Sequence, residues 1–272
     1  MRGEFVDVAG NRLYYFAAGS RGEGVPVILL HGFPTSSRIW QGVIRDFPEG
    51  HRLVVCDLPG YGRSEVGPGP VDCEALAQGV LGLMDDLRIQ RAALAGHGLG
   101  GGVAQAIAVR APGRISHLAL IDSAAFGHAP TRLARFARLI APLAKWLPPG
   151  LLAGLVQGSV RTGFSDPERH RLSLDTCLQP FTSRAGRDLL VRHLRALPRC
   201  PTAGLTPSLA ALRIPTAIVW GAEDRFYPVS LAERLRAAIP DATLEVVAGA
   251  SHFLPEDAPD RVRAAIARLL AR

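Results

Sequence analysis

Ala-Gly-His-Gly-Leu-Gly-Gly-Gly, at positions 95–102, is the stretch that decides how this chain folds. A short apolar run at 92–95 leads into it, and a helical pattern at 99–110 leaves it. The five residues 96–100 have the spacing of a nucleophile elbow, a sharp strand-to-helix turn that normally lifts a serine hydroxyl into an active site. The central residue here is Gly98, which has no side chain and cannot attack. The stretch therefore predicts a strand, a turn and a helix around a position that lacks its attacking group.

Strand and helix patterns alternate on both sides of this turn. Short apolar runs predict buried strands at 25–30, 53–56, 118–121, 216–220 and 243–247. Helical patterns lie at 36–47, 72–87, 229–239 and 258–270. Near the start of the chain, Gly10-Asn11 predicts the turn of an antiparallel hairpin. This alternation predicts an α/β fold, with a mostly parallel twisted sheet that carries helices on both faces.

The strand rhythm stops between about residue 125 and residue 207. This segment shows only helical patterns separated by prolines. One pattern forms an amphipathic stripe of Leu133, Phe136, Ile140, Leu143 and Leu147. An all-helical insertion between two strands would cover the C-terminal edge of the sheet, where open α/β folds bind ligands. We therefore expect a core of residues 1–124 and 208–272 and a helical cap of residues 125–207.

The composition is that of an ordered globular chain, with 48% hydrophobic residues, 20% charged residues and a formal charge of +7 over 272 residues. Lys145 is the only lysine, so the other 30 basic residues are arginines. These arginines are scattered among acidic residues and form no block, which argues against a surface for nucleic acid.

Cysteine usage and hydropathy indicate the cellular compartment in which we expect the protein. The four cysteines, Cys56, Cys73, Cys177 and Cys200, are scattered and form no Cys-x-x-Cys motif, which predicts reduced thiols. The first ten residues do not read as a signal peptide, and no apolar run approaches the roughly 18 residues of a membrane helix. We expect a cytoplasmic protein with neither a nucleic-acid nor a membrane partner, and the sequence does not give the oligomeric state.

Four further motifs each follow a predicted strand. They are His31-Gly32-Phe33-Pro34, Asp57-Leu58-Pro59-Gly60-Tyr61-Gly62-Arg63-Ser64, Gly221-Ala222-Glu223-Asp224 and Gly249-Ala250-Ser251-His252-Phe253. Together with the turn at 96–100, and in this order, they resemble the α/β-hydrolase family with a helical cap. The resemblance covers nearly the whole chain. It implies a hydrolase that acts on carboxylic esters or related acyl substrates.

The residues around Gly98 are most similar to the serine esterase and C–C hydrolase branch of that family. Epoxide hydrolases have an aspartate at this position and need tyrosines in the cap, but none of the four tyrosines of this chain lies in the predicted cap. Haloalkane dehalogenases usually follow the aspartate with tryptophan, where this chain has Leu99. We therefore expect serine to be the residue that Gly98 replaces.

The family's order of nucleophile, acid and histidine falls on position 98, Asp224 and His252. The resemblance implies that His252 acts as general base and then as general acid, while Asp224 accepts its Nδ1–H. The backbone N–H groups of Phe33 and Leu99 would form the oxyanion hole.

An apolar ester or carbonyl compound is the expected substrate, and we expect His31, Phe33, Trp146 and Phe253 to contact it. His97, beside the elbow, is expected to be a hydrogen-bonded structural residue. The chain has no metal-ligand spacing and no Gly-x-Gly-x-x-Gly after its first buried strand, so no cofactor is implied.

Glycine at position 98 relieves backbone strain, because a non-glycine residue with positive φ costs about 1–3 kcal/mol. The substitution should stabilise the fold and remove the usual activity. Three functions stay open. The first is an ester hydrolase, present here as an inactive variant or as a reprogrammed scaffold. The second is a lyase, cyclase or cofactor-free oxygenase that uses the His252–Asp224 pair. The third is a ligand-binding protein without catalysis. A displaced nucleophile at Ser123 is a minor fourth alternative.

Overall fold

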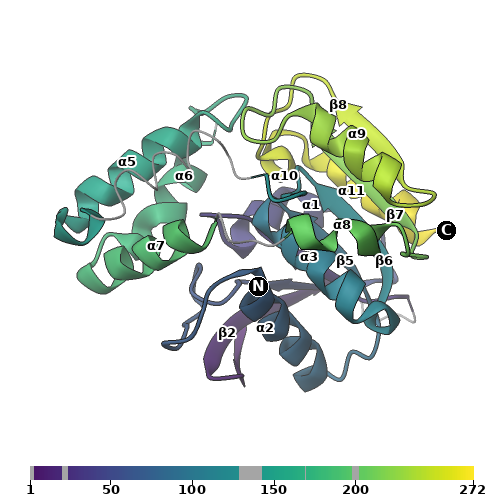
Figure 1. The fold of residues 1–272 in the computed structure, drawn as a ribbon, viewed down its shortest axis with the longest axis horizontal. Helices are drawn as coiled ribbons and strands as arrows, with labels where there is room; N and C mark the ends of the chain where they lie inside the picture. Colours follow the sequence, from purple (N-terminus) through teal and green to yellow (C-terminus); the bar gives the residue numbers. More distant parts are fainter. Residues whose placement is uncertain (1–2, 20–23, 129–142, 169, 198–201) are drawn as a thin grey trace.

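The computed structural model describes residues 3–19, 24–128, 143–168, 170–197 and 202–272. In this part of the chain, eight strands form one sheet in the order β1-β2-β4-β3-β5-β6-β7-β8 (Figure 1). The strands are β1 (Glu4–Val8), β2 (Asn11–Gly19), β3 (Val27–Leu30), β4 (Arg52–Cys56), β5 (Ala92–His97), β6 (Ile115–Ile121), β7 (Thr216–Gly221) and β8 (Thr243–Val247).

The strand pairing separates an antiparallel edge from a parallel centre. β1 pairs with β2, and β2 with β4, in antiparallel fashion, while the pairs from β4 to β8 are parallel. All residues of β3, β5 and β7 are buried, because helices cover both faces of the parallel part. The C-terminal ends of the parallel strands therefore meet at one edge of the sheet.

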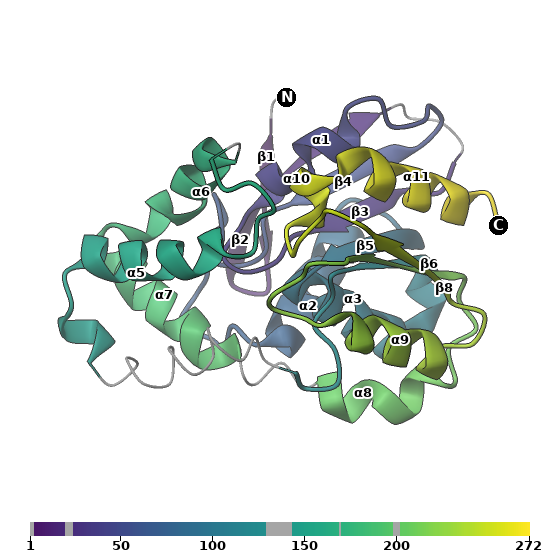
Figure 2. The ribbon, with the colours of Figure 1, turned by 90° about the horizontal axis from the view of Figure 1, so that it is seen from above.

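Two helical layers enclose the sheet (Figure 2). One face carries α1 (Gln41–Ile44) and α11 (Pro259–Leu270), and the other carries α2 (Cys73–Asp86), α3 (Leu99–Arg110), α8 (Thr202–Leu209) and α9 (Val229–Ala238). Short helical turns connect other elements: η1 (Ser37–Trp40), η2 (Pro112–Arg114) and α10 (Leu254–Asp257).

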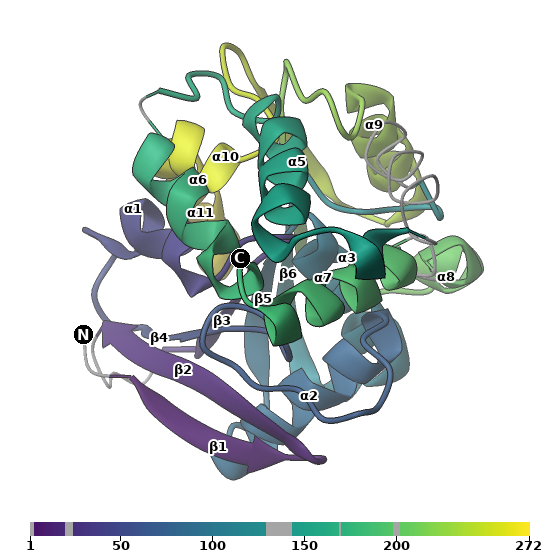
Figure 3. The same ribbon diagram turned by 90° about the vertical axis from the view of Figure 1, so that its left-hand side faces the viewer.

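A separate group of helices stands beside the C-terminal edge of the sheet. It contains η3 (Ala144–Trp146), α5 (Pro149–Arg161), α6 (Arg171–Leu178), η4 (Gln179–Phe181) and α7 (Arg184–Ala196). Figure 3 shows α5, α6 and α7 in front of the strands. The described residues between β6 and β7 contain no strand, as the sequence predicts.

The predicted elements are confirmed with small shifts at their ends, and α3 and β8 have the predicted bounds. The predicted helix at 36–47 is instead the 3-10 turn η1 followed by α1, with Ser36 as the N-cap. The division into a core and a cap of residues 125–207 stays a proposal, and α8 would belong to the core because it packs against α3. Three residues of the predicted stripe, Leu133, Phe136 and Ile140, lie outside the described residues.

The expectation of reduced thiols is wrong for one cysteine. Cys73, at the start of α2, is disulfide-bonded. Cys56 and Cys177 are free and buried. Disulfides are typical of oxidising compartments, so the cysteine pattern no longer supports the predicted cytoplasmic location.

Candidate active site

The elbow lies where β5 ends and α3 begins. Gly98 has φ 54° and ψ −119°, a backbone conformation that residues with side chains rarely adopt. Its N–H donates to the carbonyl of Ile121, at 3.1 Å, and its own carbonyl accepts the N–H of Ala124, at 2.9 Å. The strained turn that normally presents a serine is therefore retained, although no side chain uses it.

A side chain at position 98 would point toward a histidine. A Cβ placed on Gly98 would lie 3.5 Å from His252 Nε2 and 3.5 Å from Gly32 Cα, both ordinary contact distances. A serine at this position would therefore meet no steric obstacle. Its hydroxyl would extend from a point within reach of the imidazole nitrogen that acts as the base in a catalytic triad.

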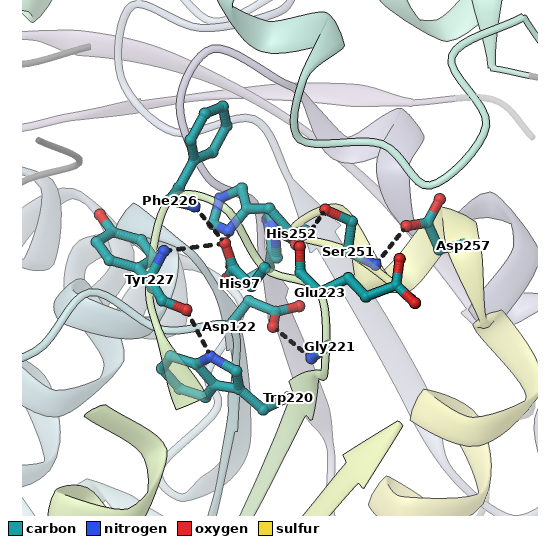
Figure 4. Close-up of polar contacts among 11 residues, drawn as sticks. His97, Asp122, Trp220, Gly221, Glu223, Phe226, Tyr227, Ser251, His252 and Asp257 are labelled. Carbon is teal, nitrogen blue, oxygen red and sulfur yellow. Dashed lines mark hydrogen bonds and ion pairs between the residues drawn. The ribbon is translucent and has the colours of Figure 1, made fainter. Parts of the chain in front are cut away.

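The two predicted partners of the nucleophile are joined in the structure. His252 Nδ1 lies 2.9 Å from Asp224 Oδ2, and both side chains are almost fully buried. Asp224 Oδ1 accepts the backbone N–H groups of Phe226, at 2.7 Å, and Tyr227, at 2.9 Å (Figure 4). Because Asp224 is fixed by these bonds and accepts the Nδ1–H, the imidazole of His252 is held with its Nε2 directed toward Gly98.

The loops that carry this pair are tied to each other. Ser251 Oγ donates to the carbonyl of Glu223, at 3.1 Å (Figure 4). Because Ser251 precedes His252 and Glu223 precedes Asp224, this bond links the two loops. Glu223 N–H in turn donates to the carbonyl of Ala250, at 3.0 Å. These bonds between the two loops therefore hold Asp224 and His252 next to each other, and position 98 takes no part in them.

Aromatic rings enclose His252. The rings of Phe226, Tyr227 and Phe253 lie 4.9, 5.3 and 5.0 Å from the imidazole, centroid to centroid. His97, as predicted, is structural: it is fully buried and its Nε2–H donates to the carbonyl of His252, at 2.8 Å. Burial, with the nearby His252 ring, lowers the pKa of His97 well below its usual value, so His97 stays neutral.

The predicted oxyanion hole lies beside the elbow. Leu99 is the first residue of α3, and Phe33 follows Gly32, whose Cα approaches position 98. Neither the Phe33 nor the Leu99 N–H has an acceptor among the described residues. Gly32 is needed for this approach, because a Cβ there would come within 3.0 Å of His97 Nδ1. The role of both N–H groups stays a prediction.

Two residues expected at the substrate are placed elsewhere. His31 is fully buried, its Nδ1 lies 2.9 Å from the carbonyl oxygen of Gly32, and its Nε2 accepts the N–H of Leu58, at 2.9 Å. With both nitrogens occupied by backbone groups, His31 braces the loop at 31–34 and presents nothing to a ligand. Trp146 is 76% exposed, and its ring lies 5.1 Å from Lys145 Nζ. The structure does not bring Trp146 to the pair.

The other two expected contacts lie in apolar packing close to the pair. Phe33 is buried, and its ring meets Tyr61 edge-on with 6.3 Å between centroids. Phe253 is fully buried and stacks on Phe164 at 4.2 Å. The alternative nucleophile Ser123 is fully buried, accepts Gln105 Nε2–H at 2.9 Å and lies 3.0 Å from the carbonyl oxygen of Ala124, so it is not free to attack.

A buried carboxyl group beside the pair was missed from the sequence. Asp122 follows β6 with φ 41°, and its Oδ1 accepts the N–H of Gly221 at 2.8 Å. Burial and the adjacent Asp224 raise the pKa of Asp122 well above its usual value. The protonated form of Asp122 is therefore favoured next to the carboxyl group of Asp224. The only signal in the sequence is its place directly after a predicted strand.

A second histidine–carboxylate group was also missed, and we call it the His170 cluster: His170, Glu256 and Asp257. His170 Nδ1 lies 3.3 Å from Glu256 Oε2, and His170 Nε2 lies 3.3 Å from Asp257 Oδ1. Burial lowers the pKa of His170, but the two carboxylates outweigh burial and raise it to about 9. Asp257 also accepts the N–H of Ser251 at 2.9 Å (Figure 4), so the cluster joins the α5–α6 connection to the loop of His252.

In the part of the chain that the structure describes, no three His, Cys, Asp or Glu side chains are arranged to hold a metal ion. Among the same residues, no helix is both long and apolar enough to cross a membrane.

Comparison with known proteins identifies the family of this chain. A family model described as alpha/beta hydrolase fold matches residues 25–259. An uncharacterised protein of Mycobacterium tuberculosis is 30% identical over 95% of this chain and 78% of its own length. A cis-3-alkyl-4-alkyloxetan-2-one decarboxylase of Shewanella oneidensis is 27% identical over 95% and 85%. A thermophilic esterase structure from Thermogutta terrifontis superposes with a TM-score of 0.82 and 26% identity, covering 100% of this chain and 98% of that one. The chain belongs to the alpha/beta hydrolase fold family.

Proposed function

We propose that this chain carries the site of a carboxylic ester hydrolase of the Ser–His–Asp type, with Gly98 at the nucleophile position. The observation that carries the proposal is the intact pair: His252 Nδ1 lies 2.9 Å from Asp224, and Nε2 lies 3.5 Å from the point where a Cβ of residue 98 would be. A pair kept in this geometry beside an elbow fits acyl transfer. The substrate that we propose is an apolar ester or related carbonyl compound.

In such a site each group has one task. A hydroxyl at position 98 would attack the ester carbonyl while His252 takes its proton, and Asp224 would stabilise the imidazolium that forms. The N–H groups of Phe33 and Leu99 would receive the oxygen as it gains charge. With Gly98 in place the covalent step is absent, so no acyl-enzyme forms on this chain.

A second candidate function uses the same pair without a covalent step. The retained bond between His252 and Asp224 in a chain without a nucleophile favours it. His252 Nε2 would accept a proton from a bound substrate or from a water molecule beside Gly98. The similarity to an oxetanone decarboxylase supports testing a lyase reaction, in which the C–O bond and one C–C bond of a β-lactone ring break to give carbon dioxide and an alkene. This reaction transfers no net proton, so His252 would act in it as a hydrogen-bond donor to the lactone oxygen while the C–O bond breaks.

Restoring the nucleophile tests the first function. We expect Gly98→Ser to hydrolyse short p-nitrophenyl esters on the order of 10³-fold faster than Gly98→Ala, which adds the same Cβ and strain without a hydroxyl. Adding His252→Ala to the serine variant should return the rate to that of the alanine variant. Equal rates for the serine and alanine variants would reject the esterase proposal.

The unmodified chain tests the second function. It should convert a cis-3,4-dialkyl β-lactone to an alkene, and His252→Ala should abolish the conversion. An inert chain whose serine variant is an active esterase would reject the lyase. Tight ligand binding without turnover in either form would instead support a binding protein. The absence of a nucleic-acid or membrane partner and the cytoplasmic location stay predictions.

A further inference from the structure

A cavity of about 690 Å³ lies apart from the catalytic pair. Tyr14 of β2 and Asp57, which follows β4, are both on its wall, and Asp57 N–H donates to the carbonyl of Tyr14 at 2.9 Å. The cavity is therefore at the same edge of the sheet as the pair. Because the sheet order is β2-β4-β3-β5, it lies on the β2 side of the site, where η1, α1 and η4 complete its wall. Gly98, Asp224 and His252 do not line it.

Three arginines give this cavity a positive charge. Arg38, Arg45 and Arg63 line it, and none has a carboxylate within ion-pair distance among the described residues. Asp57 is the one acidic residue of the wall. Its Oδ1 accepts the N–H of Ser37, at 2.6 Å, and its Oδ2 accepts the N–H of Arg63, at 2.8 Å. The carboxylate is thus engaged by backbone donors, and the guanidinium groups are left for a ligand.

The rest of the wall is partly apolar. Phe16, Ile44 and Pro180 line the cavity together with Tyr14. The guanidinium carbon of Arg63 lies 4.2 Å above the ring centroid of Tyr14, which holds its planar group against the wall. A pre-oriented guanidinium loses less entropy when it binds an anion.

We propose that this cavity binds a carboxylate monoanion that carries an apolar chain. Guanidinium groups bind carboxylates through paired charge-assisted hydrogen bonds, and the apolar wall accommodates the chain. Asp57 adds a buried negative charge to the same wall, which favours a singly charged head group over a phosphate dianion. This site goes beyond the proposed function, since none of its residues belongs to the catalytic pair or to the expected oxyanion hole.

Calorimetric titration of the full chain with hexanoate tests the site. We expect saturable binding of one hexanoate, weaker binding of acetate and of 1-hexanol, and an affinity that falls as salt is added. Arg38→Gln, Arg45→Gln and Arg63→Gln should each weaken hexanoate binding about tenfold, the effect of losing one charge-assisted contact. Arg236→Gln, an exposed arginine of α9 with no ion pair among the described residues, is the matched control and should bind hexanoate as the parent does.

Several outcomes would overturn the proposal. These are no saturable binding, equal affinity for 1-hexanol, tighter binding of inorganic phosphate, or affinities unchanged in all three arginine variants. Loss of hexanoate binding in His252→Ala, with binding intact in Arg38→Gln, would place hexanoate at the catalytic pair instead. Thermal unfolding of each variant shows whether it is folded. If one arginine variant does not fold, the other two still test the proposal.

Discussion

Two histidine–carboxylate groups on neighbouring loops of this molecule have opposite designs. His252 meets one carboxylate, Asp224, whose other oxygen is already bound by two backbone N–H groups. His170 instead lies between two carboxylates, Glu256 and Asp257, and its pKa rises to about 9. One carboxylate orients the ring of His252, whereas two carboxylates favour the protonated form of His170.

The two groups are linked through one residue. Asp257 faces His170 and also accepts the N–H groups of Ser251 and Ser165, while Ser251 precedes His252. Phe253 N–H donates to the carbonyl of Gly163, at 3.1 Å, beside this link. The His170 cluster thus fastens the α5–α6 connection to the loop that carries His252. Four predictions test this contrast.

The largest expected difference is between the effects on kcat of replacing Asp224 and of replacing Asp257. In a Gly98→Ser background, Asp224→Asn should lower kcat for ester hydrolysis about 10⁴-fold, because an amide at this position favours the wrong tautomer of the catalytic histidine. Asp257→Asn in the same background should have a much smaller effect on kcat, since the Asp257 side chain bonds Ser251 and not His252 itself. Steady-state kinetics of both variants provide the measurement, and equal losses would remove the distinction between the two groups.

Breaking the His170 cluster should cost stability. His170→Gln leaves two buried or partly buried carboxylates without their cation, and we expect the free energy of unfolding to fall by roughly 2–4 kcal/mol. Arg161→Gln, which removes an exposed ion pair with Glu168 in the same cap region, should cost less than about 1 kcal/mol. Urea denaturation measures both, and a smaller loss for the histidine variant would contradict the role of the cluster.

The stabilisation that the His170 cluster contributes should decrease as the pH rises. The folded pKa of His170, about 9, is above the ordinary value of 6.5. Its contribution is therefore present in full below pH 6.5 and is lost as the pH rises through about 9. Denaturation between pH 6 and pH 10 should show the difference between the parent and His170→Gln shrinking over that window. A difference that grows with pH would show that His170 is not held protonated.

The smallest expected effect is the change in stability when Gly98 of the elbow is replaced. Gly98→Ala should lower the free energy of unfolding by about 1–3 kcal/mol, because alanine must adopt the positive φ of this position while its Cβ meets no close neighbour. Ala106→Gly in α3 is a useful reference, since it costs roughly 1 kcal/mol by helix propensity alone. Thermal and urea unfolding give both values, and a stabilising Gly98→Ala would refute the strain argument.

Much of the site could be predicted because the motifs are local. The glycines at positions 96, 98 and 100–102 indicate a tight turn and a closely packed helix, and Gly100 confirms this: a Cβ there would lie 2.5 Å from the carbonyl oxygen of His31. Asp224 and His252 each follow a strand of the parallel sheet, so the fold brings them to one edge. Residues that depend on cap packing, such as Trp146, were placed wrongly, because an amphipathic pattern does not say which partner an apolar face meets.

The sequence by itself determined the α/β architecture, the position of the elbow and the missing nucleophile, because hydrophobic periodicity and strand-end motifs are short-range properties of the chain. Only the tertiary structure decided the protonation of the surrounding groups. His170 and Asp257 are far apart in the sequence, and the pKa of Asp122 is raised only because this residue is buried beside Asp224. A pKa depends on burial and on the charges within a few ångströms, and both arise from packing between distant segments.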